Sequence, residues 1–99
     1  MHYLSFELSE GDEGVTTLEA MASTSAEQHA AVMAEVQQVL GWAWQRFPQS
    51  HGPADDGMDW DHDLQFSVEG GRWHAVTLTL TGSSRFIEAF LVHFGSVAG

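Results

Sequence analysis

One long amphipathic segment constrains the fold more than any other feature of this sequence. Residues 26–47 read AEQHAAVMAEVQQVLGWAWQRF, and apolar side chains recur there at the spacing of a helix. Ser25 followed by Gln28 predicts a capping box at its start, and Pro48 ends it because the residue before a proline disfavours helical geometry. At about 1.5 Å per residue the helix is roughly 34 Å long, whereas a seven-residue strand spans about 23 Å. We therefore expect the helix to overhang the sheet or to bend at Gly41. The apolar stripe consists of Val32, Val36, Val39, Leu40, Ala43 and Phe47.

Alternating apolar and polar residues predict strands before this helix. In residues 3–9, YLSFELS, every second side chain is apolar, which is typical of a half-buried strand. Residues 15–22, VTTLEAMA, fit either a returning strand or a short helix capped by Thr16 and Glu19. The pair of threonines and the preceding polar turn favour the strand.

Two further alternating segments predict a hairpin after the helix. They are DLQFSVE at residues 63–69 and WHAVTLTLT at residues 73–81. A three-residue loop over residues 70–72 pairs Phe66 with Val76 and keeps apolar side chains on one face. A two-residue turn would instead set apolar against polar positions, so we predict the three-residue loop.

A second helix follows this hairpin, and it completes the predicted architecture. It is expected to begin after a cap at Ser84 and to end at Gly95. The element order is then β-β-α-β-β-α, with one apolar sheet face for two amphipathic helices to cover. This predicts an α+β two-layer sandwich, with a four-stranded, mainly antiparallel sheet and both helices on one face. A length of 99 residues predicts a single domain over residues 1–99.

Charge is the most unusual property of the composition. Fourteen Asp and Glu face three Arg and no Lys, for a formal net charge of −11. Such a charge argues against nucleic acid and membrane surfaces as partners, and leaves a basic protein, bound cations or solubility as explanations.

The absence of cysteine excludes disulfides and thiolate chemistry. Without a signal-peptide pattern or a long apolar run, we expect a cytoplasmic protein.

The stretch HGPADDGMDWDHD at residues 51–63 is the one place where metal-ligating residue types concentrate. A calcium loop starting at Asp59 fails, because its sixth position, where glycine is required, is Leu64. If the following strand begins early, Asp61 lies on one face of the pleat and His62 on the other. A solvated acidic loop and strand face is then the simplest interpretation. The alternative is a divalent-metal site, structural or enzymatic, formed by His51, Asp55, Asp56, Asp59, Asp61 and His62.

We identify no catalytic residues and expect a binding protein rather than an enzyme. The leading interpretation is a small acidic protein-interaction module whose open sheet face binds a basic protein or a second copy, giving a homodimer. An inhibitor that mimics nucleic acid and binds a basic protein is a further alternative; it requires the acidic residues to lie along one face. The predicted binding surface consists of Tyr3, Trp42, Gln65, Trp73, Thr77 and Thr79.

Overall fold

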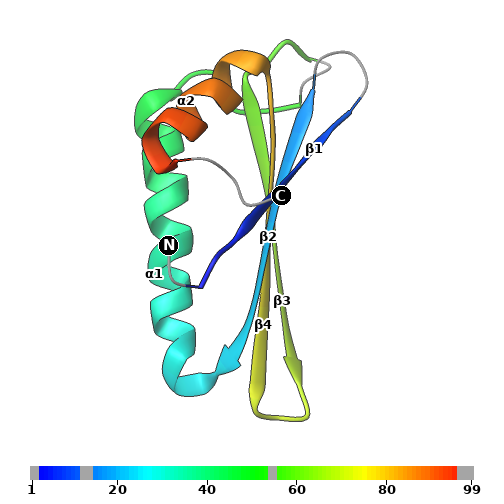
Figure 1. Cartoon of the computed structure of the whole chain (residues 1–99), viewed down its shortest axis with the longest axis vertical. Helices are drawn as coiled ribbons and strands as arrows, with labels where there is room; N and C mark the ends of the chain where they lie inside the picture. Colours follow the sequence, from blue (N-terminus) through cyan, green and yellow to red (C-terminus); the bar gives the residue numbers. More distant parts are fainter. Residues whose placement is uncertain (1–2, 12–14, 54–55, 96–99) are drawn as a thin grey trace.

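A sheet forms one layer of the protein and two helices form the other (Figure 1). The computed structural model describes residues 3–11, 15–53 and 56–95. The element order is β-β-α-β-β-α, so the predicted α+β architecture is confirmed. The elements are β1 (Phe6–Glu10), β2 (Thr16–Ser25), α1 (Ala26–Arg46), β3 (Trp60–Glu69), β4 (Trp73–Gly82) and α2 (Ser84–Phe94).

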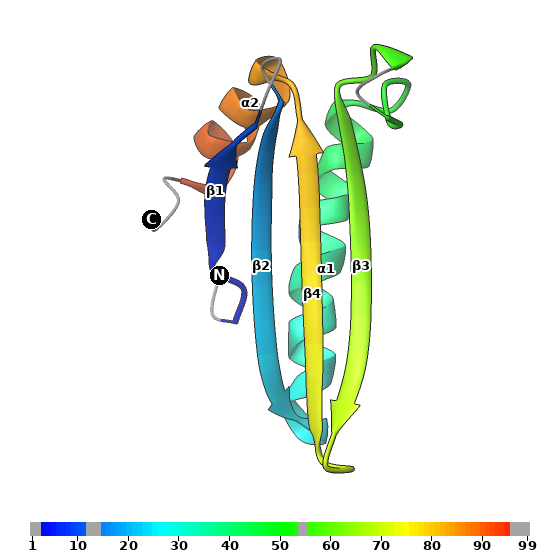
Figure 2. The ribbon, with the colours of Figure 1, turned by 90° about the vertical axis from the view of Figure 1, so that its right-hand side faces the viewer.

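The four strands are antiparallel throughout and follow the order β1-β2-β4-β3 (Figure 2). Strands β2 and β4 are central, and β1 and β3 are the edges. Phe66 pairs with Val76 and Glu69 with Trp73, which confirms the three-residue hairpin loop over residues 70–72. Its glycines adopt positive φ, a conformation that side chains disfavour.

Residues 15–22 fall largely within strand β2, as predicted. Leu18, Ala20 and Ala22 are buried while Glu19 and Met21 are exposed, which is the alternation of a strand covered on one face. The central strands have ten residues each, about 33 Å, and α1 has 21 residues, about 32 Å. We expected the helix to overhang the sheet because we assumed strands of about seven residues. The ten-residue strands match the helix in length.

The two helices begin at different kinds of cap. Ser25 is the N-cap of α1, but its hydroxyl contacts the Gln28 side chain at 3.4 Å and makes no hydrogen bond to a helix N–H. The N-cap of α2 is Ser83, whose Oγ accepts a 3.3 Å hydrogen bond from the backbone N–H of Phe86. The predicted cap at Ser84 was therefore wrong by one residue, because the hydroxyl of Ser83 is the one that reaches the third helical N–H.

One apolar core lies between the layers, and Trp60 is its largest fully buried side chain. The sheet contributes Leu18, Ala20, Val76, Leu78 and Leu80 to the core, α1 contributes Val32, Val36, Val39, Leu40 and Ala43, and α2 contributes Phe86, Ile87 and Phe90.

None of the helices in the described ranges combines the length and apolar character needed to cross a membrane.

Candidate functional site

The loop that follows α1 runs along the outer side of the first residue of β3. The carbonyl oxygen of Ser50 accepts hydrogen bonds from the backbone N–H groups of Asp59 at 2.9 Å and Trp60 at 3.2 Å. The N–H of Gly52 donates to the carbonyl of Trp60 at 2.8 Å. His51, between them, forms an isolated parallel bridge with Trp60. These bonds place the side chain of His51 beside the edge of the sheet.

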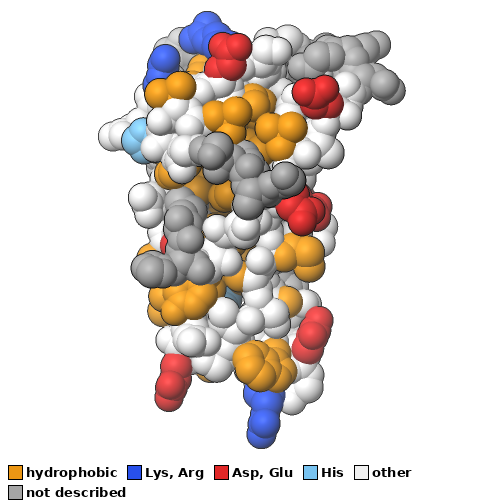
Figure 3. All heavy atoms as spheres, viewed as in Figure 1, with side chains coloured by type: hydrophobic (Ala, Val, Ile, Leu, Met, Phe, Trp, Pro, Cys, Tyr) orange, Lys and Arg blue, Asp and Glu red, His pale blue; other side chains and the backbone are white. Residues whose placement is uncertain are grey.

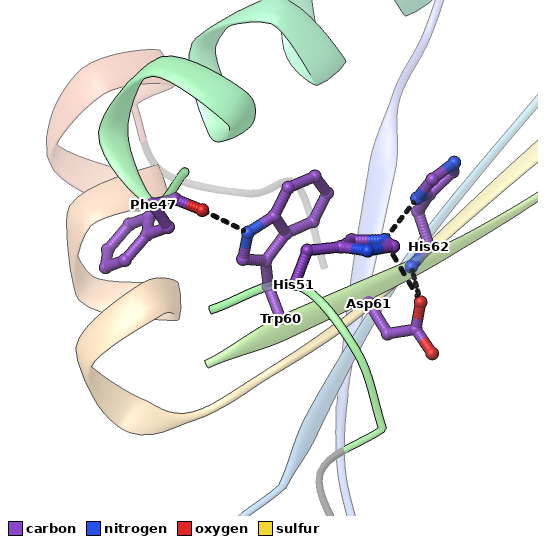
Figure 4. Close-up of polar contacts among 5 residues, drawn as sticks. All are labelled: Phe47, His51, Trp60, Asp61 and His62. Carbon is purple, nitrogen blue, oxygen red and sulfur yellow. Dashed lines mark hydrogen bonds and ion pairs between the residues drawn. The ribbon is translucent and has the colours of Figure 1, made fainter. Parts of the chain in front are cut away.

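Buried Trp60 fixes this loop against the helix layer. Its indole Nε1 donates a 3.1 Å hydrogen bond to the carbonyl oxygen of Phe47 (Figure 4). Its ring stacks on Phe86 with centroids 5.6 Å apart. The imidazole of His51 contacts the rings of both Trp44 and Trp60, with centroid distances of 4.5 Å to each. The position of the imidazole is therefore set by packing against two tryptophans.

The Nε2 atom of His51 faces two side chains of β3 (Figure 4). His51 Nε2 lies 2.9 Å from His62 Nδ1 and 3.2 Å from Asp61 Oδ1. The same Asp61 oxygen accepts a 2.8 Å hydrogen bond from the backbone N–H of His62. One ligand atom from each residue lies within 4.8 Å of the others. We call His51, Asp61 and His62 the His–Asp cluster.

Consecutive residues of a strand point to opposite faces, so Asp61 and His62 do not ordinarily share a site. They meet here because β3 is an edge strand, and His51 approaches from outside that edge. The side chains of His51 and Asp61 are 24% and 39% exposed, which leaves the cluster accessible from solvent.

Two of the other residues predicted as metal ligands, Asp56 and Asp59, do not join the cluster. Asp59 Oδ1 accepts a 3.0 Å hydrogen bond from the hydroxyl of Ser83, so this carboxylate supports the N-cap of α2. Asp56 is exposed in the preceding loop, and Asp55 lies outside the described residues. Of the five predicted ligands that the structure describes, the cluster therefore contains three: His51, Asp61 and His62. We did not predict from the sequence that Trp60 holds the loop that carries His51. The position of Trp60 among the apolar residues of the alternating pattern had indicated that it is buried.

No protein-family model, curated protein or solved structure matches this chain. The cluster is therefore interpreted from its chemistry. Two imidazole nitrogens and one carboxylate suit zinc and similar transition metals, whereas calcium and magnesium prefer oxygen alone. Around an ion with bonds near 2.1 Å, neighbouring ligand atoms are about 3.0 Å apart in an octahedron and about 3.4 Å apart in a tetrahedron. The separations of 2.9 and 3.2 Å from His51 Nε2 lie within about 0.2 Å of these values.

The predicted binding surface is only partly brought together. Gln65, Trp73, Thr77 and Thr79 lie on the sheet face opposite the helices, with Gln65 paired to Thr77 across β3 and β4. Trp73 is 48% exposed at the hairpin end of this face. These four residues form the open face that the alternation predicted.

The other two residues of that surface lie elsewhere. Tyr3 precedes β1 and packs against the core, and its backbone N–H donates to the carboxylate of Glu35 on α1. Trp42 is half-buried against α2, stacked on His93 with centroids 5.5 Å apart. Trp42 therefore lies apart from the open sheet face with which it was grouped, because α2 packs over this side of α1.

Acidic side chains spread along the molecule, whereas basic ones stand at its two ends in the face shown in Figure 3. On the open face, Glu7 pairs with Glu19, and Thr79 connects Glu19 to Asp63 across the sheet. Other carboxylates belong to α1 and α2, including Glu27 and Glu88. A mimic of nucleic acid requires its acidic residues to lie along one face. The acidic residues of this chain are not confined in that way.

Proposed function

We propose that the protein binds a divalent transition-metal ion of the zinc type through His51 Nε2, His62 Nδ1 and Asp61 Oδ1. The observation that supports this most directly is the approach of His51 Nε2 to both other ligand atoms, at 2.9 and 3.2 Å. In the metal-free protein one of the two facing nitrogens donates a hydrogen bond to the other. A bound ion takes the place of that shared proton.

Packing and hydrogen bonding around the cluster favour metal binding because they hold the ligand atoms in position before the ion binds. The His51 ring contacts Trp44 and Trp60, and the N–H of His62 orients the Asp61 carboxylate. Groups that orient metal ligands typically change affinity by about 10- to 100-fold when removed. Three protein ligands leave at least one coordination position for water.

The charge of the chain and the type of ligand atoms together determine which ion the cluster prefers. A formal charge of −11 raises the local concentration of any cation, but the two imidazoles discriminate among them. Nitrogen ligands favour zinc, nickel and copper over calcium and magnesium. We therefore expect zinc to bind and the two oxygen-preferring ions to leave the cluster unchanged.

Isothermal titration calorimetry with zinc, and separately with calcium and magnesium, tests this proposal. We expect one saturable zinc site, with affinity lowered at least about tenfold by His62→Ala and by Asp61→Asn. The matched controls are His93→Ala, an exposed histidine on α2, and Asp63→Asn, an exposed aspartate on the same strand. Unchanged zinc affinity in both cluster variants would overturn the assignment.

A further inference from the structure

Among the residues that the structure describes, the outer side of β3 is paired only at its beginning. The loop at Ser50 and Gly52 pairs with Trp60, and the Asp61 carboxylate accepts the N–H of His62. Beyond that point, within the described ranges, no strand pairs with this side of β3. Figure 2 shows the strand running uncovered along the edge of the sheet to the hairpin. Its pairing with β4 is continuous over ten residues.

The backbone groups left without a strand partner belong to apolar residues. In an antiparallel pair, backbone groups face the neighbouring strand and the outside at alternate residues. Trp60 directs its N–H and carbonyl outward, so Leu64, Phe66 and Val68 do the same. Phe66 and Val68 are 56% and 58% exposed at the margin of the helix-covered face. Free hydrogen-bonding groups and uncovered apolar side chains therefore coincide.

Edge strands usually carry a device against further pairing, such as proline, lysine or a bulge. Strand β3 contains neither proline nor lysine, and its ladder has no bulge. Its open-face side carries Asp61, Asp63 and Glu69 instead. A second copy would bring the same carboxylates alongside, in a chain that already has a formal charge of −11. Charge complementarity thus favours a basic partner over self-association.

We propose that β3 binds an extended segment of a basic partner protein by strand addition along Leu64 to Val68, and that this segment alternates apolar with Lys or Arg residues. Apolar side chains of the segment cover Phe66 and Val68, while its cations face Asp63 and Glu69. Backbone hydrogen bonds supply affinity, and the two-residue alternation supplies specificity. This inference stands independently of metal binding at the His–Asp cluster.

Amide NMR with the peptide KVKVKVKVK, at fixed ionic strength, tests strand addition. We expect saturable shifts over residues 62–69 and little change on β1. The block peptide KKKKKVVVV, of the same composition, is the control for charge alone. Equal binding of the block peptide, or shifts confined to the open face around Trp73, would overturn the proposal, as would dimerisation of the chain through β3.

Two sets of variants separate the backbone and charge contributions. Val68→Pro removes an outward N–H without breaking the pairing with β4, and we expect at least about tenfold weaker peptide binding. The double variant Asp63→Asn and Glu69→Gln is expected to weaken binding about threefold or more. Its control, Glu10→Gln with Glu88→Gln, makes the same charge change away from β3. Equal effects of the two double variants would contradict the assigned edge.

Discussion

The indole Nε1 of Trp60 donates a 3.1 Å hydrogen bond to the carbonyl oxygen of Phe47, which joins the end of α1 to the first residue of β3. Trp60 is 1% exposed and Phe47 2% exposed, so this bond is shielded from water. The backbone of Trp60 in turn holds Ser50 and Gly52. The same residue therefore connects the core to the loop that carries His51.

Replacing Trp60 with phenylalanine tests this connection. The variant removes the indole N–H and leaves a buried carbonyl without its partner, which should lower the free energy of unfolding by about 1–3 kcal/mol. Urea unfolding measures the change. Trp44→Phe is the control, since Trp44 is 44% exposed and should change stability by less than about 1 kcal/mol. Equal losses in the two variants would contradict the part assigned to the Phe47 bond.

The N-cap of α2 is tested by two neighbouring serines. Ser83→Ala removes both the bond from the Phe86 N–H and the donor to Asp59, and should destabilise the fold by about 1–2 kcal/mol. Ser84→Ala lies within the helix and is expected to leave stability unchanged or raise it slightly, because alanine has the higher helix propensity. Thermal unfolding of both variants gives the comparison, and a larger loss at Ser84 would place the cap there.

Glycine at position 82 is required by the close approach of Phe86. A Cβ built on Gly82 would meet the ring of this buried residue, so Gly82→Ala should destabilise by about 1–3 kcal/mol. Gly41, exposed in α1, has open space around its Cβ position. Gly41→Ala should therefore stabilise by about 0.5–1 kcal/mol through lower backbone entropy in the unfolded chain. Denaturant midpoints check both signs, and two changes of the same sign would contradict this packing.

Zinc should stabilise the folded chain, because only the fold brings the cluster together. At a free zinc concentration of 100 times the dissociation constant the expected gain is about 2.7 kcal/mol. A chelator should reverse the gain, and His62→Ala should abolish it while His93→Ala retains it. Scanning calorimetry with and without zinc measures it. An equal rise in melting temperature for both histidine variants would indicate binding away from the cluster.

Local patterns predicted most of the fold. Alternation around Phe66 and Val76 set the hairpin register because burial of one face leaves no choice of pairing. The cap at Ser83 was misplaced because adjacent serines look alike in sequence. The separation of Trp42 from the open sheet face was missed because it depends on where α2 packs, a relation between elements distant in the chain.

The candidate site was predictable only as a region. Residues 51–63 were singled out by composition, but the contact between His51 and His62 depends on the loop that adds to the edge of β3. Alternation placed Asp61 and His62 on opposite faces, and no pattern in the sequence shows that a third residue reaches both from outside. Asp59 supports a helix cap, whereas Asp61 contacts His51. These different roles depend on tertiary contacts and are likewise not visible in the sequence.

The most direct measurement is a long-range proton–nitrogen NMR spectrum of the histidine rings during a zinc titration. Metal binding predicts that His51 Nε2 and His62 Nδ1 shift together to the values of ligated nitrogens and saturate at one equivalent. His29, His74 and His93 should keep their signals. Unchanged His51 and His62 nitrogens, with zinc shifting other histidines or none, would contradict the proposed metal site.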